Sequence, residues 1–116
     1  MGTFFHPITI SGPRGSIQLD ALVDTGASFT SLPAQVLTDL GVQPMRRARL
    51  RLADGTSHVQ QLGEARAEID GEFVSTLIVF GEPEWPPSIG AYTLEGLMLG
   101  VDPLNKTLVP VEGWRA

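Results

Sequence analysis

The sequence predicts a mostly β fold, a small barrel or folded sheet with one or two short helices. Short runs of β-forming residues alternate between apolar and polar positions along most of the chain. The chain contains 13 glycines and 9 prolines, which separate these runs and indicate many turns. Only one segment shows convincing helical spacing of its apolar residues. A length of 116 residues fits one domain that spans residues 1–116.

The first two strands are expected near the N-terminus. Residues 4–10 are rich in β-formers, although Pro7 indicates that this strand lies at an edge or contains a bulge. A second strand follows the turn at residues 11–16 and ends at Asp24. Its alternating pattern places four apolar residues on one face: Ile17, Leu19, Ala21 and Val23.

The segment "TSLPAQVLTDLG", residues 30–41, predicts the one clear helix. Ser31 is in position to cap it, Pro33 falls in its first turn, and Gly41 follows as a left-handed stop. The apolar stripe consists of Leu32, Val36, Leu37 and Leu40. Because the helix is only about two turns long, we expect packing to stabilise it more than propensity does.

An arginine-rich hairpin is expected next, with Asp54-Gly55 as its turn. Arg47, Arg49 and Arg51 share one strand face, and Ala48, Leu50 and Leu52 share the other. A nucleic-acid-binding patch is one explanation for such a stripe. A solvated strand face is more common, and the chain as a whole is acidic with a net charge of −5, so we expect no nucleic-acid partner.

The remainder of the chain continues the β pattern. We expect Ala65, Ala67 and Ile69 to face inward before a turn at Asp70-Gly71 and an apolar strand at residues 73–80. A proline-rich loop then carries Trp85, which either forms a lid or, as we favour, covers the core. Residues 92–98 could form one helical turn, and residues 99–111 predict a strand, an Asp102-Pro103 turn and a last strand.

Composition excludes several kinds of site. The absence of cysteine rules out disulfides, zinc-thiolate sites and cysteine nucleophiles. His6 and His58 are the two histidines, so a histidine metal site or a Ser-His triad is not expected, and we predict no metal and no cofactor. No apolar run reaches the roughly 18 residues of a membrane helix, and the N-terminus does not resemble a secretory signal. We therefore expect a cytoplasmic protein without a membrane partner.

The stretch "ALVDTGAS", residues 21–28, is the strongest candidate for chemistry. Taken alone, Asp24-Thr25-Gly26 is explained by a strand that ends in an Asx turn. The surrounding sequence favours a chemical role for Asp24 over a simple turn, because Asp24 follows a strand that is predicted to be buried. The small residues Ala27 and Ser28 also allow other backbone to approach closely.

These residues resemble the active-site loop of the retropepsin-like aspartic proteases, the single-domain relatives of pepsin that include retroviral proteases. The resemblance covers roughly residues 16–111. The hairpin at residues 52–61 stands where that family has its flap. Its tip, Ala53-Asp54-Gly55, is similar to that of bacterial members, so the chain resembles a bacterial-type single-domain member that is related to the retroviral proteases. Residues 87–111 resemble the C-terminal block of the family, a hydrophobic-Gly pair followed by a short helix and a last strand. The resemblance thus implies a closed β-barrel or folded sheet with a flap hairpin.

Two alignments of that block are possible. The first makes Ile89-Gly90 the pair that packs beneath the catalytic loop, and the rival uses Leu99-Gly100. We prefer Ile89-Gly90, because it leaves room for both the helix and the final strand. Retroviral members carry Arg-Asp or Arg-Asn after the glycine, whereas this chain has Ala91-Tyr92. The ion pair that braces the dimer of those relatives is therefore absent or replaced, and the flap lacks their multiple glycines.

The resemblance implies a homodimeric aspartic endopeptidase. Its chemistry needs two carboxylates that share a proton, but this chain has one Asp-Thr-Gly, and its other aspartates are expected in turns, in the helix or facing solvent. The second carboxylate must then be Asp24 of a twofold-related copy. Asp24 would be the acid/base, and the active-site loop would comprise Thr25, Gly26, Ala27 and Ser28.

The resemblance also implies roles around Asp24. The Thr25 hydroxyl would hydrogen-bond across the dimer axis, the Gly26 N–H would bind the dyad, and Ser28 would reach the outer oxygen of Asp24. The flap residues Ala53, Asp54, Gly55 and Thr56 would close over an extended peptide. Two other functions stay open: a weakly active or inactive dimeric peptide-binding or assembly module of the same fold, and an RNA- or anion-binding β protein that uses residues 46–51.

Overall fold

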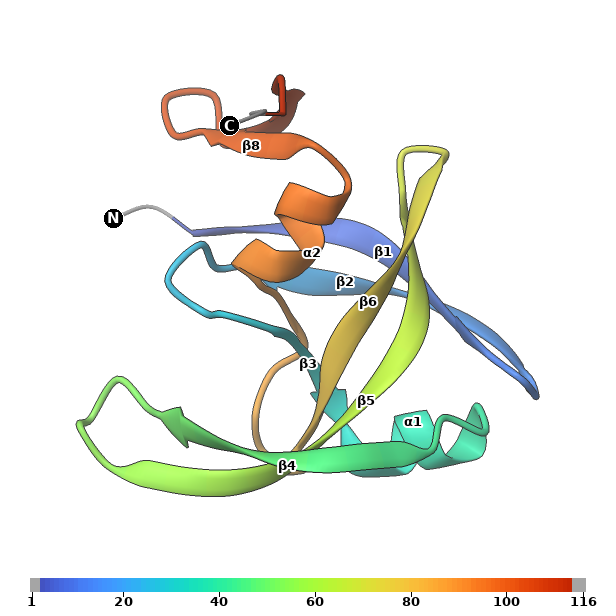
Figure 1. Cartoon of the computed structure of the whole chain (residues 1–116). Coiled ribbons are helices and arrows are strands. Elements are labelled where there is room, and N and C mark those ends of the chain that lie inside the picture. The colour runs from blue at the N-terminus through green and yellow to red at the C-terminus, as the bar shows by residue number, and fades with distance from the viewer. Residues whose placement is uncertain (1–2, 114–116) are drawn as a thin grey trace.

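The computed structural model of the chain describes residues 3–113, and this part contains nine strands and two short helices (Figure 1). In chain order the elements are β1 (Phe4–Gly12), β2 (Gly15–Val23), β3 (Thr30–Pro33), α1 (Ala34–Asp39), β4 (Pro44–Arg51), β5 (Ser57–Ile69), β6 (Glu72–Gly81), β7 (Ser88–Ile89), α2 (Ala91–Gly96), β8 (Leu99–Asp102) and β9 (Thr107–Pro110).

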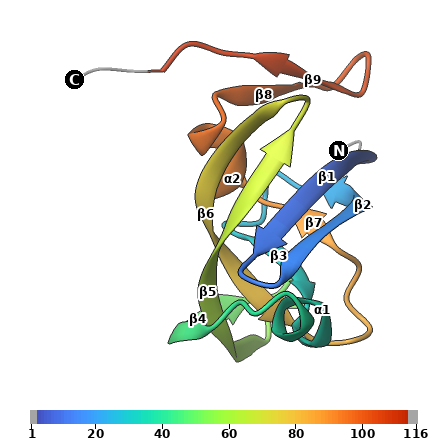
Figure 2. The ribbon, with the colours of Figure 1, turned by 90° about the vertical axis from the view of Figure 1, so that its right-hand side faces the viewer.

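Six of the strands close into a ring (Figure 2). The sheet order is β1-β2-β7-β3-β6-β5-β4, and β1 pairs additionally with β5, which joins the two sides of the sheet. The pairings β2–β7 and β3–β6 are parallel, and the other pairings of this sheet are antiparallel. The predicted mostly β barrel with two short helices is therefore confirmed. Strand β4 lies outside the ring, where it pairs only with the first half of β5.

The barrel interior is filled by the inward residues of these strands and by the two helices. In β2 the predicted alternation is present, with Ala21 and Val23 buried and Asp20 exposed. The largest fully buried apolar side chains are Ile8, Ile10, Leu32, Leu37, Leu62, Ile69, Ile78 and Ile89. They come from β1, β3, α1, β5, β6 and β7, so one core joins segments that are far apart in the sequence.

The predicted helix at residues 30–41 starts later than expected. Residues Thr30–Pro33 form β3, and α1 begins only at Ala34 with Pro33 in the N-cap position. The expected cap by Ser31 is wrong, because Ser31 lies in the strand and pairs with Val79 of β6. Parallel pairing with β6 instead provides hydrogen-bond partners for the backbone of residues 30–33, so the helix starts only after them. The end is as predicted, since Gly41 follows α1 with a φ of 81°.

Turns join the strands at the predicted places. Asp70 and Gly71, with φ values of 52° and 87°, connect β5 to β6, and Gly55, with a φ of 89°, lies in the turn between β4 and β5. Strands β8 and β9 form a separate two-stranded sheet beyond α2. Neither helix in residues 3–113 is long and apolar enough to cross a membrane.

Candidate active site

Asp24 is the first residue after β2, and the neighbouring strand β7 fixes its position. The Asp24 N–H donates to the carbonyl of Ile89 over 2.9 Å, which continues the parallel pairing of Val23 with Ile89. Val23 and Ile89 are both buried, so the backbone that carries Asp24 leaves directly from the core. Asp24 itself is half-buried, while Thr25 and Gly26 after it are exposed.

The loop that follows is an Asx turn. The Gly26 N–H donates to Oδ1 of Asp24 over 3.0 Å, and the Ala27 N–H donates to the Asp24 carbonyl over 3.1 Å. The turn therefore orients the carboxylate and leaves its second oxygen available to a ligand. Within residues 3–113, no hydrogen bond joins the Ser28 hydroxyl to Asp24.

Segment 89–92 holds the Asp24 loop through backbone hydrogen bonds. The N–H groups of Ala91 and Tyr92 donate to the carbonyls of Ala27 and Ser28 over 2.8 and 2.9 Å. Gly90 lies so close to Phe29 that a Cβ atom there would be 2.4 Å from the Phe29 carbonyl carbon. Ile89-Gly90 is thus the pair in contact with the loop. The rival pair Leu99-Gly100 lies in β8 and pairs with β9.

A buried network of three threonine hydroxyls supports segment 89–92, and the sequence alone does not indicate it. The Gly90 N–H donates to the Thr30 hydroxyl over 3.1 Å. The hydroxyls of Thr30 and Thr93 are 2.6 Å apart, and those of Thr93 and Thr76 are 2.9 Å apart. All three threonines are almost completely buried. They come from β3, α2 and β6, so no local pattern in the sequence could have indicated the network.

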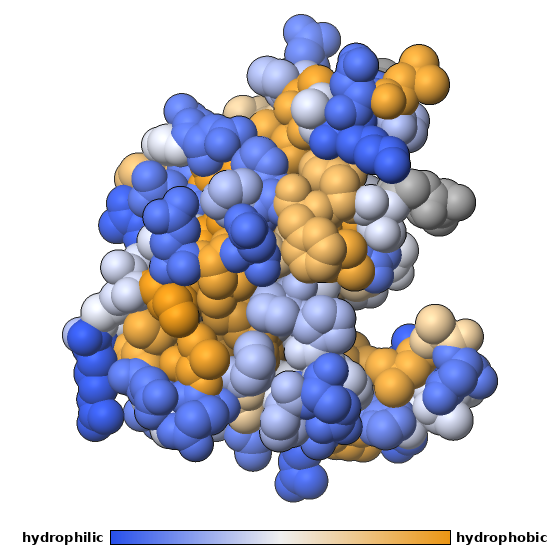
Figure 3. All heavy atoms as spheres, turned by 180° about the vertical axis from the view of Figure 1, so that it is seen from behind, coloured by the Kyte–Doolittle hydropathy of each residue, from blue (hydrophilic) through white to orange (hydrophobic). Residues whose placement is uncertain are grey.

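A cleft of about 440 Å³ separates the loop from the β4–β5 hairpin, which projects from the body of the molecule (Figure 3). Asp24 is the only acidic residue among those that line it within residues 3–113. Much of the lining is apolar, and Trp85 packs edge-on against His58 with ring centroids 6.0 Å apart. The sequence favours Trp85 as a cover of the core; in the structure Trp85 is half-buried and lines this cleft. The lining comprises Leu22, Asp24, Gly26, Ala27, Ser28, Phe29, Ser31, Arg49, Leu50, Arg51, Leu52, Val79, Trp85, Pro86 and Ser88.

The hairpin tip is a tight, exposed turn. Oδ1 of Asp54 accepts from the N–H and the hydroxyl of Thr56, over 2.9 and 2.6 Å, and these hydrogen bonds hold the pKa of Asp54 below its ordinary value. Arg51 donates from Nη1 to the carbonyl of Gly55 over 3.1 Å. The cleft reaches residues 49–52 of the hairpin, and the tip residues Ala53, Asp54, Gly55 and Thr56 are not among its lining.

A second cavity, of about 390 Å³, lies on the other side of Asp24. Its lining comprises Thr3, Phe4, Val23, Asp24, Thr25, Val101 and Pro103. Asp24 therefore forms part of the wall of both cavities, whereas Thr25 faces only the second. Within the described part of the chain, no group of three or more His, Asp or Glu side chains is placed to hold a metal ion.

Comparison with known proteins identifies a family to which most of the sequence matches. The family model of the gag-polyprotein putative aspartyl protease matches residues 14–106. The chain belongs to this aspartyl protease family. The matched range contains the Asp24 loop, the β4–β5 hairpin and the Ile89-Gly90 pair.

Solved structures of foamy virus proteins share the fold of this family member. A foamy viral protease-reverse transcriptase, solved in complex with an RNA/DNA hybrid, matches 93% of the chain with a TM-score of 0.58 and 15% identity. The Simian Foamy Virus (mac) protease matches 80% with a TM-score of 0.54 and 18% identity. The chain spans 13% of the first protein and 96% of the second. These matches are to retroviral-type proteins and do not support the bacterial-type assignment. A search of curated proteins returned no match.

Proposed function

We propose that the protein is a homodimeric aspartic endopeptidase whose active site contains Asp24 from each of two subunits. The observation that carries this proposal is the position of Asp24. It is the sole acidic residue in the lining of either cavity within residues 3–113, and one oxygen of its carboxylate has no partner in the Asx turn.

The chemistry requires two such carboxylates around one water. Two carboxylates about 3 Å apart share a single proton, because like charges at that distance do not both ionise. The ionised one takes a proton from the water, the protonated one donates to the scissile carbonyl, and the water attacks to give a tetrahedral diol. This chain supplies one of the two groups, so the site is incomplete without a second copy.

The second cavity supports a twofold partner at this position. An isologous dimer brings identical surfaces together at its axis, so the surface next to Asp24 and outside the cleft must face the partner. Thr25 is exposed on that side, where its hydroxyl would reach the partner's loop. Tyr92 is also exposed and packs against Phe29 with ring centroids 6.0 Å apart. It stands where retroviral relatives carry a charged or amide residue.

The cleft suits an extended peptide. Strand β4 is the edge strand of its sheet, and four consecutive residues of the hairpin, Arg49–Leu52, line the cleft. A peptide bound there would add a strand to this edge and would place its scissile bond over Asp24. Closure of the hairpin tip over the bound peptide would exclude water from the site.

The test compares wild type with Asp24→Asn. We expect wild type to sediment as a dimer and to cleave an unstructured protein at mildly acidic pH, and we expect Asp24→Asn to remain folded without turnover. A pepstatin-like inhibitor should raise the melting temperature of wild type more than that of Asp24→Asn. Equal turnover by the two proteins over a broad pH range would refute the enzyme. A stable dimer without turnover would favour a peptide-binding or assembly module.

A further inference from the structure

Strand β4 carries a concentration of positive charge that the rest of the site does not explain. Half of the eight Lys and Arg residues of the chain lie on this strand of eight residues: Arg46, Arg47, Arg49 and Arg51. Neither β4 nor the stretch of β5 that pairs with it, Ser57–Gly63, contains an acidic residue. Within residues 3–113 none of these arginines forms an ion pair, and His6–Asp70 is the one pair found there. Like charges along one strand repel one another, so an anionic partner would relieve them.

The backbone of β4 directs its free hydrogen-bonding groups at the cleft. The Leu52 N–H donates to the carbonyl of Thr56 over 2.8 Å, which makes these two residues a hydrogen-bonded pair. Pairs alternate in an antiparallel ladder, so Leu50 and His58 form the next such pair. The N–H and C=O groups of Arg49 and Arg51 therefore point away from β5. They face the free edge, along which the cleft runs.

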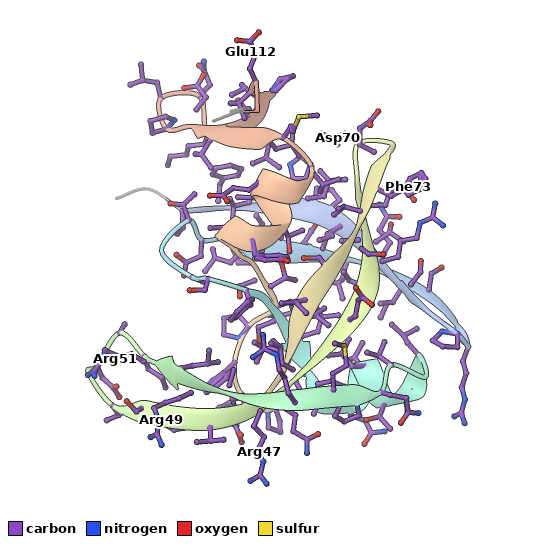
Figure 4. All side chains as sticks on the ribbon, in the orientation of Figure 1. Arg47, Arg49, Arg51, Asp70, Phe73 and Glu112 are labelled. Atoms are coloured by element: carbon purple, nitrogen blue, oxygen red, sulfur yellow. The ribbon has the colours of Figure 1, made fainter. Side chains whose placement is uncertain are left out.

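The two faces of strand β4 carry side chains of different chemistry. Leu50 lies on the face that looks toward the barrel, since its cross-strand partner His58 packs on Trp85. Arg49 lies on the opposite face with Arg51 and Arg47, and its partner there is the exposed Val59. Figure 4 shows the three arginines spread along the hairpin, with Arg47 and Arg49 projecting away from the barrel.

A peptide that adds to this edge must alternate in the same way. Its residues opposite Arg49 and Arg51 are two positions apart and point to the outer face, within reach of the guanidinium groups. The residue between them points to the inner face, beside Leu50 and into the apolar part of the cleft. From this geometry we propose that the protease selects substrates in which two acidic residues flank one apolar residue, with the acidic side chains seated on Arg49 and Arg51. This inference rests on the proposed function, because it assumes that the substrate binds along β4.

Both guanidinium groups are available to such a substrate. Arg51 uses one of its five N–H donors on the carbonyl of Gly55, which holds its side chain at the hairpin tip. The nearby carboxylate of Asp54 is engaged by Thr56. Within residues 3–113 the one acidic residue that lines the cleft is Asp24, on the opposite wall.

The experiment measures binding and cleavage of a peptide series in which one acidic pair moves along an otherwise neutral, apolar sequence. We expect affinity to alternate with a period of two residues, and to rise roughly two- to fivefold for each acid in the outer register, as for exposed ion pairs. Binding is measured on Asp24→Asn, which holds the peptide without cutting it, and KM is measured on wild type. The preference should fall as salt rises.

Two variants assign the preference to its residues. Arg49→Gln with Arg51→Gln should abolish the alternation, and Arg49→Glu with Arg51→Glu should transfer it to lysine-containing peptides. Arg14→Gln with Arg66→Gln is the matched control, because it removes the same two positive charges from other parts of the molecule, where Arg14 lies beside Gly41 and Arg66 lies over the Phe73 ring.

The outcomes separate this inference from the proposed function. Equal affinity for neutral and acidic peptides, or a preference that the Arg49 and Arg51 variants leave intact, would overturn the inference even if Asp24-dependent cleavage is present. Alternating affinity on Asp24→Asn without turnover by wild type would support the inference and refute the protease. If the protein binds RNA, loses that binding in the Arg49 and Arg51 variants, and does not distinguish acidic from neutral peptides, the arginines of β4 would instead be assigned to nucleic-acid binding.

Discussion

The Asp24 loop and the β4–β5 hairpin face each other across one cleft, but they are held in opposite ways. Three backbone hydrogen bonds attach the loop to segment 89–92, and buried threonine hydroxyls hold that segment in turn. The hairpin leaves the barrel with β4 paired on one side only, and its tip is held by its own turn. Interactions that stabilise the loop reach the core, whereas those of the hairpin tip are local and exposed.

This difference matches the roles that we propose for the two regions. A carboxylate that shares a proton with its twin must be placed to within a fraction of an ångström, so its support has to be rigid. A hairpin that admits a peptide and then covers it must open at low cost, which few buried contacts allow. Substitutions in segment 89–92 or in the threonines that hold it should therefore lower the stability of the whole domain. Substitutions at the hairpin tip should mainly change ligand binding.

The largest effect is expected at Gly90. In Gly90→Ala the new Cβ would lie 2.4 Å from the backbone of Phe29, which cannot move without displacing the Asp24 loop. We expect the free energy of unfolding to fall by about 3 kcal/mol and the melting temperature to fall by roughly 10 °C. Peptidase activity should be lost as well. Thermal unfolding followed by circular dichroism measures this. Gly71→Asn is the control, because Gly71 has a positive φ, open space around it, and a conformation that Asn tolerates. A stable, active Gly90→Ala would contradict the close packing of Gly90 against Phe29.

A smaller effect is expected at Thr30. Thr30→Val keeps the shape of the side chain but leaves the Gly90 N–H and the Thr93 hydroxyl with one partner fewer in a buried site. The free energy of unfolding should fall by about 1–3 kcal/mol. We expect kcat to fall more than KM rises, because the Asp24 loop moves while the free edge of β4, where the peptide binds, does not. Thr30→Ser retains the oxygen and should recover most of kcat. Unchanged kcat in a destabilised Thr30→Val would show that the network is purely structural.

At the hairpin tip, Gly55→Ala should affect binding more than stability. Gly55 has a φ of 89°, which a residue with a Cβ adopts at a cost of about 1–2 kcal/mol, and nothing lies near enough to clash. Because the tip is separate from the core, we expect the melting temperature to change less than in Thr30→Val while KM for a peptide increases. A drop in melting temperature as large as that of Gly90→Ala would show that the hairpin and the loop are one cooperative unit.

The smallest effect concerns the titration of Asp54. Its folded-state pKa is lowered by the hydroxyl and the N–H of Thr56. The turn is therefore stabilised above the unfolded-state pKa, and this contribution is lost as pH falls through the lower folded-state pKa. Thr56→Val should move the pKa of Asp54 upward, and Thr56→Ser should leave it low, as NMR titration of the carboxyl carbon would show. An unchanged pKa in Thr56→Val would mean that the hydroxyl does not hold the turn.

Local patterns in the sequence predicted much of the fold. Alternation indicated β2, and Asp54-Gly55 and Asp70-Gly71 marked their turns, because strand faces and turn conformations depend on neighbouring residues. The Asp24 turn was visible for the same reason. The segment Thr30–Pro33 misled the prediction, because its residues suit a helix start and its pairing with β6 depends on residues almost fifty positions away.

The features that the sequence could not predict are all long-range. Thr30, Thr76 and Thr93 look like ordinary strand and helix residues until the barrel closes around them. The pairing of β1 with β5, which closes the ring, joins residues nearly sixty positions apart. The position of the free edge of β4 along the cleft likewise appears only once the hairpin has folded opposite the Asp24 loop.

The central claim is that Asp24 is half of an active site whose other half lies on a second copy of the chain. Mixing wild-type and Asp24→Asn subunits in varying ratio, after exchange at constant total protein, tests this most directly. If both carboxylates are required, peptidase activity should follow the square of the wild-type fraction and fall to about a quarter in an equal mixture. Activity that instead falls in direct proportion to the wild-type fraction, to about half in the equal mixture, would mean that each chain works alone and would contradict the account.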